Sequence, residues 1–487
     1  MKQRASRTLL ALLPALLLGV AAAVPSVCIG AETAAVVGVK VPAHQRFVLP
    51  NGLTILLVPR KDVPLIAFSG FVRGGALADP AGKPGVGSLV AGLLDRGAGK
   101  RNAFEFADAV EGVGGSFSAG AGAESISVGG QFLARDRALM IELLADALMR
   151  PRFEAQEFST YRDREIEFIK SAKDSDPSQL IGIYGRAALF GSHPYGRPQG
   201  GSERTLASIT HADVVAFHAA NFGPDRATLV FAGDLDPKWM RQALTTAFAG
   251  WAKSRAAAVE LKPAPRVTGR QVLLVDSPGS VQTYFWLGNV GVDRRYSGRP
   301  ALDLVNTLYG GRFTSILNTE LRIKSGLSYG ASSRFTRGSV PGEFSIRSFT
   351  QTDNTGKALD LTLETLEKLK HGDIAPDMLE SARAYALGQF PLQLETASHW
   401  ATALADLEFY GLTRDYIEGY GPALTKVDLA ETAAVTADAF PRPSDLVIVL
   451  VGDAAKIRET AAKYGTVTEM KISDPDFAPG SVQRTTP

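Results

Sequence analysis

Cysteine is almost absent from this sequence: Cys28 is the only one in 487 residues. It lies in the leader-like stretch described below, so a chain cleaved after that stretch has no thiol. Such a chain forms no disulfide and offers no cysteine as a metal ligand or nucleophile. Disulfide-stapled scaffolds are therefore excluded, and stability must come from the core and from partners.

Histidine is scarce as well, with six in the chain: His44, His193, His211, His218, His371 and His399. None lies four residues from another, the spacing with which one helix face holds zinc. His211 and His218 share a predicted helix face but are separated by roughly 10 Å, too far for one zinc ion. We interpret both as surface or helix-cap residues, and His193 as a residue that fixes its loop by a hydrogen bond.

An excess of either charge sign is also missing, with 52 lysines and arginines against 50 acidic residues. Lys2, Arg4 and Arg7 lie in the first thirty residues, which contain no acid. The remaining chain is near neutral, so it has no basic field for binding nucleic acid.

The amino-terminal residues predict a secretory signal peptide over residues 1–31. MKQRASR is a positive segment, TLLALLPALLLGVAAAV is apolar, and cleavage is expected after Ala31. An uncleaved membrane anchor is the alternative, but the apolar run is short and contains Pro14. A lipid anchor at Cys28 is disfavoured because Val27, not a small residue, precedes it. We expect an exported, periplasmic protein that has no membrane attachment once the leader is removed.

The rest of the chain consists of two halves in which the predicted elements follow the same order. An apolar run ends on Gly-Asp in both halves, and Asp453 follows Asp234 by 219 residues. The opening strands TILLVP and QVLLVD correspond at nearly the same offset, 217 residues between Val58 and Val275. Two matches at nearly one offset indicate an internal duplication.

Each half mixes strands with paired amphipathic helices, which predicts an α+β fold: two homologous domains, each a mostly antiparallel sheet covered on one face by helices. We place the domains at residues 45–252 and 268–472. The joint at 253–267 is rich in Ala and Pro, and a loose tail is expected at 473–487.

Several motifs appear in the order typical of one enzyme family. They are GVGSLVAGLL (residues 85–94), HPYGRP (193–198) and LYGGRFTSILNTELRIKSGLSYG (308–330). Together they make the chain resemble the pitrilysin or insulinase-type zinc peptidases over nearly its whole length after the leader. Arg312, Phe313 and Thr314 depart locally from the family's usual small-residue-then-serine pattern.

The resemblance also shows what has been lost. Family members carry H-x-x-E-H on the first helix, with two zinc ligands and a general base. Here the three key positions are Ser88, Ala91 and Gly92. The family's third ligand, a later glutamate, falls near Glu165 and Glu167. Glu167 could be its relic, but we interpret both as solvated helix residues. We expect no metal or other cofactor in this chain.

Arg322 and Tyr329 match the arginine–tyrosine pair of the family's second domain. There the pair faces the zinc site, where a tyrosine hydroxyl and an arginine can stabilise an oxyanion. The resemblance therefore implies that this chain is the non-zinc subunit of a heterodimeric zinc endopeptidase acting on unfolded peptides. Its partner would be a homologous subunit with H-x-x-E-H and the zinc, and the present chain would be inactive alone.

Two other hypotheses remain. The first is a non-catalytic peptide-binding or scaffold protein of the same fold, in which Arg322 and Tyr329 have no catalytic use. The second is an independent hydrolase that uses Ser88 as its nucleophile. This is the weakest, because no histidine is near Ser88 in the sequence.

Overall fold

The computed structural model describes residues 38–372 and 374–479. The predicted signal peptide, Cys28 and residues 480–487 of the predicted tail lie outside the described residues. Within the described part, no helix combines the length and the apolar composition that crossing a bilayer requires.

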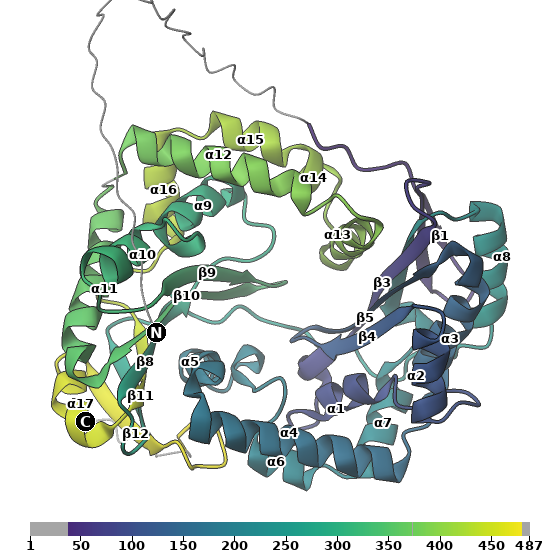
Figure 1. Cartoon of the computed structure of the whole chain (residues 1–487), viewed down its shortest axis with the longest axis horizontal. Coiled ribbons are helices and arrows are strands. Elements are labelled where there is room, and N and C mark those ends of the chain that lie inside the picture. Colours follow the sequence, from purple (N-terminus) through teal and green to yellow (C-terminus); the bar gives the residue numbers. More distant parts are fainter. Residues whose placement is uncertain (1–37, 373, 480–487) are drawn as a thin grey trace, which may run out of the picture. The chain divides into compact units, whose positions relative to one another are not determined.

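The first half contains a six-stranded sheet in the order β1–β2–β6–β3–β5–β4. Four of its strands, β1, β3, β5 and β4, are labelled in Figure 1. All its pairings are antiparallel except that of β2 with β6. Every residue of β6 is buried, as expected for an apolar central strand. The strands are β1 (Gln45–Val48), β2 (Thr54–Pro59), β3 (Leu65–Arg73), β4 (Ser116–Ala121), β5 (Ser125–Leu133) and β6 (Ala227–Gly233).

The second half contains another six-stranded sheet, in the order β12–β7–β11–β8–β10–β9. Here β7 pairs in parallel with both β11 and β12, and the other pairings are antiparallel. The strands are β7 (Gln271–Asp276), β8 (Gln282–Val290), β9 (Ala331–Arg337), β10 (Pro341–Gln351), β11 (Val447–Gly452) and β12 (Thr466–Lys471).

Five strands of the two sheets follow one another in the same order. Val58 pairs with Ala232 in the first sheet, and Val275 pairs with Val451 in the second. These pairs are separated by the 217 and 219 residues that the sequence repeats predict. The sixth strands differ: β1 comes from before the repeat and β12 from after it, and sequence patterning missed both. The α+β prediction with two mostly antiparallel sheets is confirmed.

Helices surround both sheets. In the first half they are α1 (Val86–Leu93), α2 (Ala103–Glu111), α3 (Arg137–Met149), α4 (Ala155–Ser175), α5 (Ile181–Phe190), α6 (Glu203–Ser208), α7 (His211–Asn221) and α8 (Pro237–Phe248). In the second half they are α9 (Arg299–Asn306), α10 (Ile316–Asn318), α11 (Thr355–Lys370), α12 (Pro376–Leu392), α13 (Ala397–Tyr410), α14 (Asp415–Glu418), α15 (Tyr420–Lys426), α16 (Leu429–Ala439) and α17 (Ala454–Ala462). The described residues of the predicted joint, 253–267, contain no helix or strand.

Each sheet also receives one helix from the other half of the chain. Helix α13 packs on β3 and β6 of the first sheet, and α5 packs on β8 and β11 of the second (Figure 1). Trp400 of α13 belongs to the core formed with the first sheet, and Phe409 meets Phe71 edge-on at 4.7 Å between ring centroids. On α5, a Cβ at Gly185 would lie 2.5 Å from the Trp286 indole, so glycine permits this close approach.

The start of the predicted loose tail is packed against the first half. Phe477 is 2% exposed and meets Tyr184 of α5 edge-on at 5.1 Å. Lys173 donates a 2.6 Å hydrogen bond to the carbonyl of Asp474. The polar composition of this segment suggested looseness, but one aromatic anchor and these polar contacts hold residues 473–479 in place.

Candidate functional site

The lost zinc motif lies on α1, as predicted. Asp79 accepts hydrogen bonds from the amides of Gly85 and Gly87, each 2.7 Å long, and so caps the start of this helix. Burial raises the pKa of Asp79 to about 7, although the two amide bonds act in the opposite direction. Ser88 is partly exposed, while Ala91 is buried. The helix is therefore well fixed, but its ligand positions carry no zinc-binding groups.

The space beside Gly92 is filled by Tyr161 of α4. A Cβ at Gly92 would lie 2.0 Å from the Tyr161 hydroxyl oxygen and 2.1 Å from its Cζ. The Tyr161 ring is stacked between Arg96 and Arg164, whose guanidinium carbons lie 4.9 and 4.6 Å from its centroid. A histidine at position 92 would collide with this ring, so the residues present do not fit a zinc ion.

The two predicted glutamates differ in their surroundings. Glu167 is 68% exposed by side chain and bonds Lys170 at 2.7 Å, which confirms the solvated-surface interpretation and argues against a relic ligand. Glu165 pairs with Arg164 at 3.2 Å. Burial, and then the charge of Glu165, raise the pKa of Tyr161. Glu165 follows Tyr161 by four residues on α4, so both lie on the side of that helix toward α1. In the described residues, no group of three or more His, Cys, Asp or Glu side chains could hold a metal.

The histidines take structural roles. His193 accepts a hydrogen bond from the Tyr195 amide at 3.1 Å and contacts the Lys262 carbonyl at 2.7 Å, which confirms its predicted role in fixing the loop. His218 corrects the surface interpretation, because its ring packs between Phe153 and Phe222 and bonds the Leu148 carbonyl at 3.0 Å. Burial lowers the pKa of His218 to about 4. No histidine hydrogen-bonds Ser88 in the described residues, so nothing supports Ser88 as a nucleophile.

Arg322 and Tyr329 lie against each other. Arg322 is in a π-helical turn, Thr319–Lys324, that follows α10, and the left-handed Gly326 reverses the chain just after it. Tyr329 lies just before β9. The Arg322 guanidinium carbon lies 4.3 Å from the Tyr329 ring centroid and 4.8 Å from that of Phe313.

Both aromatic rings beside Arg322 face solvent. Tyr329 is 74% exposed and Phe313 is 59% exposed. In the described part of the chain, neither the Arg322 guanidinium nor the Tyr329 hydroxyl has a hydrogen bond or ion pair. The stack therefore presents a cation and a hydroxyl that remain available to a ligand.

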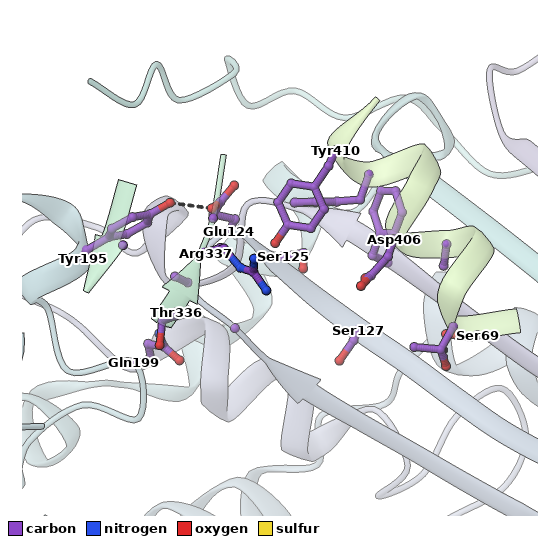
Figure 2. A pocket seen from close by; sticks show the side chains of 18 of the residues that line it. Ser69, Glu124, Ser125, Ser127, Tyr195, Gln199, Thr336, Arg337, Asp406 and Tyr410 are labelled. Carbon is purple, nitrogen blue, oxygen red and sulfur yellow. Dashed lines mark hydrogen bonds between the residues drawn. The ribbon is translucent and has the colours of Figure 1, made fainter. Parts of the chain in front are cut away.

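A cavity of about 350 Å³ lies between residues of the two halves (Figure 2). Glu124, in the turn between β4 and β5, accepts hydrogen bonds from the Tyr195 hydroxyl at 2.6 Å and the Ser339 amide at 2.8 Å. Ser339 lies in the turn between β9 and β10, so Glu124 joins the equivalent hairpins of both halves. Arg337 and Asp406 contribute opposite charges to the same cavity.

Sequence reasoning missed Tyr161 and Glu124. Gly92 was a usable signal for Tyr161, because a glycine inside a helix often marks a position where another group packs closely against the backbone. Glu124 had no local signal, since its partners lie far away in the sequence.

Comparisons with known proteins agree with this structure. Residues 66–199 match the profile described as Insulinase (Peptidase family M16), and residues 208–385 match that described as Peptidase M16 inactive domain. The chain is 27% identical over 395 residues to an uncharacterized zinc protease of Mycobacterium bovis, covering 81% of this chain and 90% of the relative. It is 24% identical over 409 residues to one of Streptomyces coelicolor, covering 83% and 89%.

Two solved structures share the fold. A peptidase M16 inactive domain from Pseudomonas fluorescens matches with a TM-score of 0.78 and 23% identity, covering 84% of this chain and 98% of that one. A protease from Helicobacter pylori matches with a TM-score of 0.76 and 21% identity, covering 84% and 99%. The chain belongs to peptidase family M16, the pitrilysin or insulinase-type peptidases, and departs from H-x-x-E-H at all three key positions.

Proposed function

We propose that this chain is the non-zinc subunit of an exported, two-chain zinc endopeptidase that cleaves unfolded peptides. Arg322 and Tyr329 complete the zinc site of a homologous partner subunit. One observation carries the proposal: this chain holds an exposed arginine–tyrosine stack without protein ligands, while Tyr161 fills the space beside its own lost zinc motif.

The chemistry of the stack suits peptide hydrolysis. A scissile carbonyl becomes an oxyanion during attack by water, and a preorganised donor stabilises that charge. The Tyr329 hydroxyl can donate one such hydrogen bond. Arg322 offers a planar set of N–H donors, and its two aromatic neighbours limit the freedom of its guanidinium group. The zinc, the base and the attacking water belong to the partner.

A non-catalytic peptide-binding or scaffold role is the second candidate. Its support is β4, the edge strand of the first sheet, which packs beside α1. An edge strand exposes backbone groups that can pair with an extended peptide. This role needs neither Arg322 nor Tyr329, so the two functions make different predictions for substitutions there.

The test is to purify residues 32–487 alone and together with an exported homologue that bears H-x-x-E-H and is encoded nearby. Zinc per chain and hydrolysis of an unfolded peptide are measured for each sample. We expect no stoichiometric zinc and no hydrolysis for the chain alone, and activity for the complex. A tightly bound zinc with chelator-sensitive activity in the isolated chain would refute the proposal. A complex that forms but gains no activity over the partner alone would favour the scaffold role.

A further inference from the structure

A second cavity, of about 430 Å³, lies wholly within the second half of the chain. Its lining comes from the segment before α9, from α9 and the turn that follows it, from the end of β9, from α12 and its C-terminal cap, and from α14 and α15. The charged residues on its wall, among those that the structure describes, are Arg294, Arg299, Arg337 and Asp303. This wall therefore has more positive than negative groups.

The ion pairs around the cavity leave one guanidinium in excess. Asp303 pairs with Arg337 at 3.0 Å and with Arg299 at 3.5 Å, and it also accepts a 2.8 Å hydrogen bond from the Tyr420 hydroxyl. Arg294 pairs with Asp406 at 2.8 Å. Three guanidinium groups thus share two carboxylates. A partly buried cation without its own counter-charge is costly, and an anionic ligand would offset that cost.

The arginines are also held in place. The guanidinium carbon of Arg299 lies 3.7 Å from the Tyr416 ring centroid and 4.1 Å from that of Tyr420. Its Nη1 donates to the Tyr416 carbonyl at 2.6 Å. Arg294 Nε and Arg337 Nη1 are buried and have no hydrogen-bond acceptor among the described residues. Arg299 Nε has only its 3.5 Å ion-pair contact with Asp303, which is too poor in geometry for a hydrogen bond. The cluster is therefore rigid and has more donors than acceptors.

Helix α12 adds neutral polar groups to the same cavity. Tyr385 and Gln389 line it from one face of α12, and Gln393, the residue that caps the end of this helix, continues the same spacing of four residues. Carboxamide side chains can both donate to and accept from peptide groups. The cavity thus has a cationic wall and, on α12, a row of groups suited to peptide backbone.

We propose that this cavity binds the C-terminal carboxylate of a short peptide, with Arg294, Arg299 and Arg337 supplying the positive charge. Gln389 and Gln393 bond the peptide groups that precede the carboxylate. A planar carboxylate suits guanidinium donors, which bind it through paired hydrogen bonds. The volume is within the range of small-ligand pockets, about 300–1,000 Å³. The site is separate from Arg322 and Tyr329 and does not rest on the proposed peptidase role.

Titration calorimetry on residues 32–487 tests the site with three probes: acetyl-tetraalanine as the free acid, the same peptide with a C-terminal amide, and inorganic phosphate. We expect the free acid to bind and the amide to bind at least about tenfold more weakly, because the amide has lost the charge. Equal binding of acid and amide, or no binding of the acid, would overturn the proposal. Phosphate that binds more tightly than the free acid would also overturn it, in favour of a general anion site.

Two substitutions locate the binding. Arg337→Gln removes one charge and leaves Asp303 paired with Arg299, so we expect at least about tenfold weaker binding of the free acid. Gln393→Glu places a negative charge at an exposed position on the α12 side of the cavity, and it should also abolish or strongly weaken binding. Gln156→Glu, at an exposed position on α4, is the matched control and should bind as the unchanged chain does. Circular dichroism melting checks that each variant is folded.

If Arg337→Gln does not fold, Gln393→Glu decides the question. Unchanged affinity of the folded Gln393→Glu variant would refute this location, whatever the acid and amide peptides show for the unchanged chain.

Discussion

Substitution of Gly92 by alanine tests whether Tyr161 really closes the lost metal position. A Cβ at this position would lie 2.0 Å from the Tyr161 hydroxyl oxygen, whereas unstrained contacts between heavy atoms are near 3.5–4.0 Å. The ring or the helix must therefore move by about 1.5 Å. Overpacking of this kind costs roughly 1–3 kcal/mol. If the ring swings out instead, it loses its stacking on Arg96 and Arg164, about 0.5–1 kcal/mol for each contact.

The helical propensity of alanine acts in the opposite direction and stabilises the chain. Alanine replaces an uncrowded helical glycine with a gain of about 0.5–1 kcal/mol. Gly388, inside α12, provides the matched control, because an added Cβ there meets no atom within 4 Å. We expect Gly388→Ala to stabilise the chain by up to about 1 kcal/mol. We expect Gly92→Ala to destabilise it by up to about 2.5 kcal/mol, the overpacking cost less the helix gain.

Equilibrium urea denaturation of the two variants, followed by far-ultraviolet circular dichroism, measures these differences. In a chain that also carries Tyr161→Ala, Gly92→Ala should stabilise and no longer destabilise the fold. The coupling free energy between the two sites should be about 0.5–3 kcal/mol. The reasoning is refuted if Gly92→Ala stabilises the chain as Gly388→Ala does while Tyr161 is present. For the same reason, Ser88→His, Ala91→Glu and Gly92→His together should not create a stoichiometric zinc site, which metal analysis checks directly.

Three further predictions concern catalysis and pH. In the complex with a zinc-bearing partner, Tyr329→Phe should lower kcat about 10²-fold in single-turnover hydrolysis, because it removes one donor to the oxyanion. Assembly of the complex should be unchanged. Full activity of the variant in an intact complex would mean that the Arg322–Tyr329 stack has only a structural role. Arg322→Ala should impair both binding and turnover and Arg322→Lys should rescue only partly, because an ammonium lacks the planar fork; full rescue by lysine would contradict this. The pKa of His218 is about 4 in the folded chain, below its unfolded value of about 6.5, so its contribution to stability is present above pH 6.5 and is lost as pH falls toward 4. His218→Gln should reduce the loss of unfolding free energy between pH 6.5 and 4 by at most about 3 kcal/mol. An unchanged pH dependence would show that protonation of His218 does not cause this loss.

The sequence was most informative where the signal was local or repeated. Apolar runs ending on Gly-Asp gave the central strands β6 and β11, and their spacing gave the correspondence between the sheets. Strands β1 and β12 were missed because each is a short edge strand with a mixed burial pattern that depends on its neighbour. Local patterning does not reveal such strands when the stabilising contacts lie elsewhere in the chain.

The site could be predicted only in part for the same reason. Ser88, Ala91 and Gly92 show directly that zinc ligands are missing, because a ligand is a property of the side chain itself. That Tyr161 fills the space, and that His218 is enclosed by two phenylalanines, depends on helices and loops meeting in three dimensions. The arginine cavity belongs to this second class, since Arg294, Arg337 and Asp406 are distant in sequence.

The exchange of α5 and α13 between the two sheets bears on how this chain arose. The two helices occupy equivalent places in the repeat, after α4 and α12, and they cover equivalent strand pairs. A contact in which each copy gives the other the same element is the isologous arrangement of a two-fold dimer. The polypeptide thus has the organisation of a symmetric homodimer whose two subunits were fused by the joint at 253–267. An ancestor with a single half would have needed a second copy of itself to cover its sheet. Dimerisation of such units would then be older than the fusion that joined two of them in one chain.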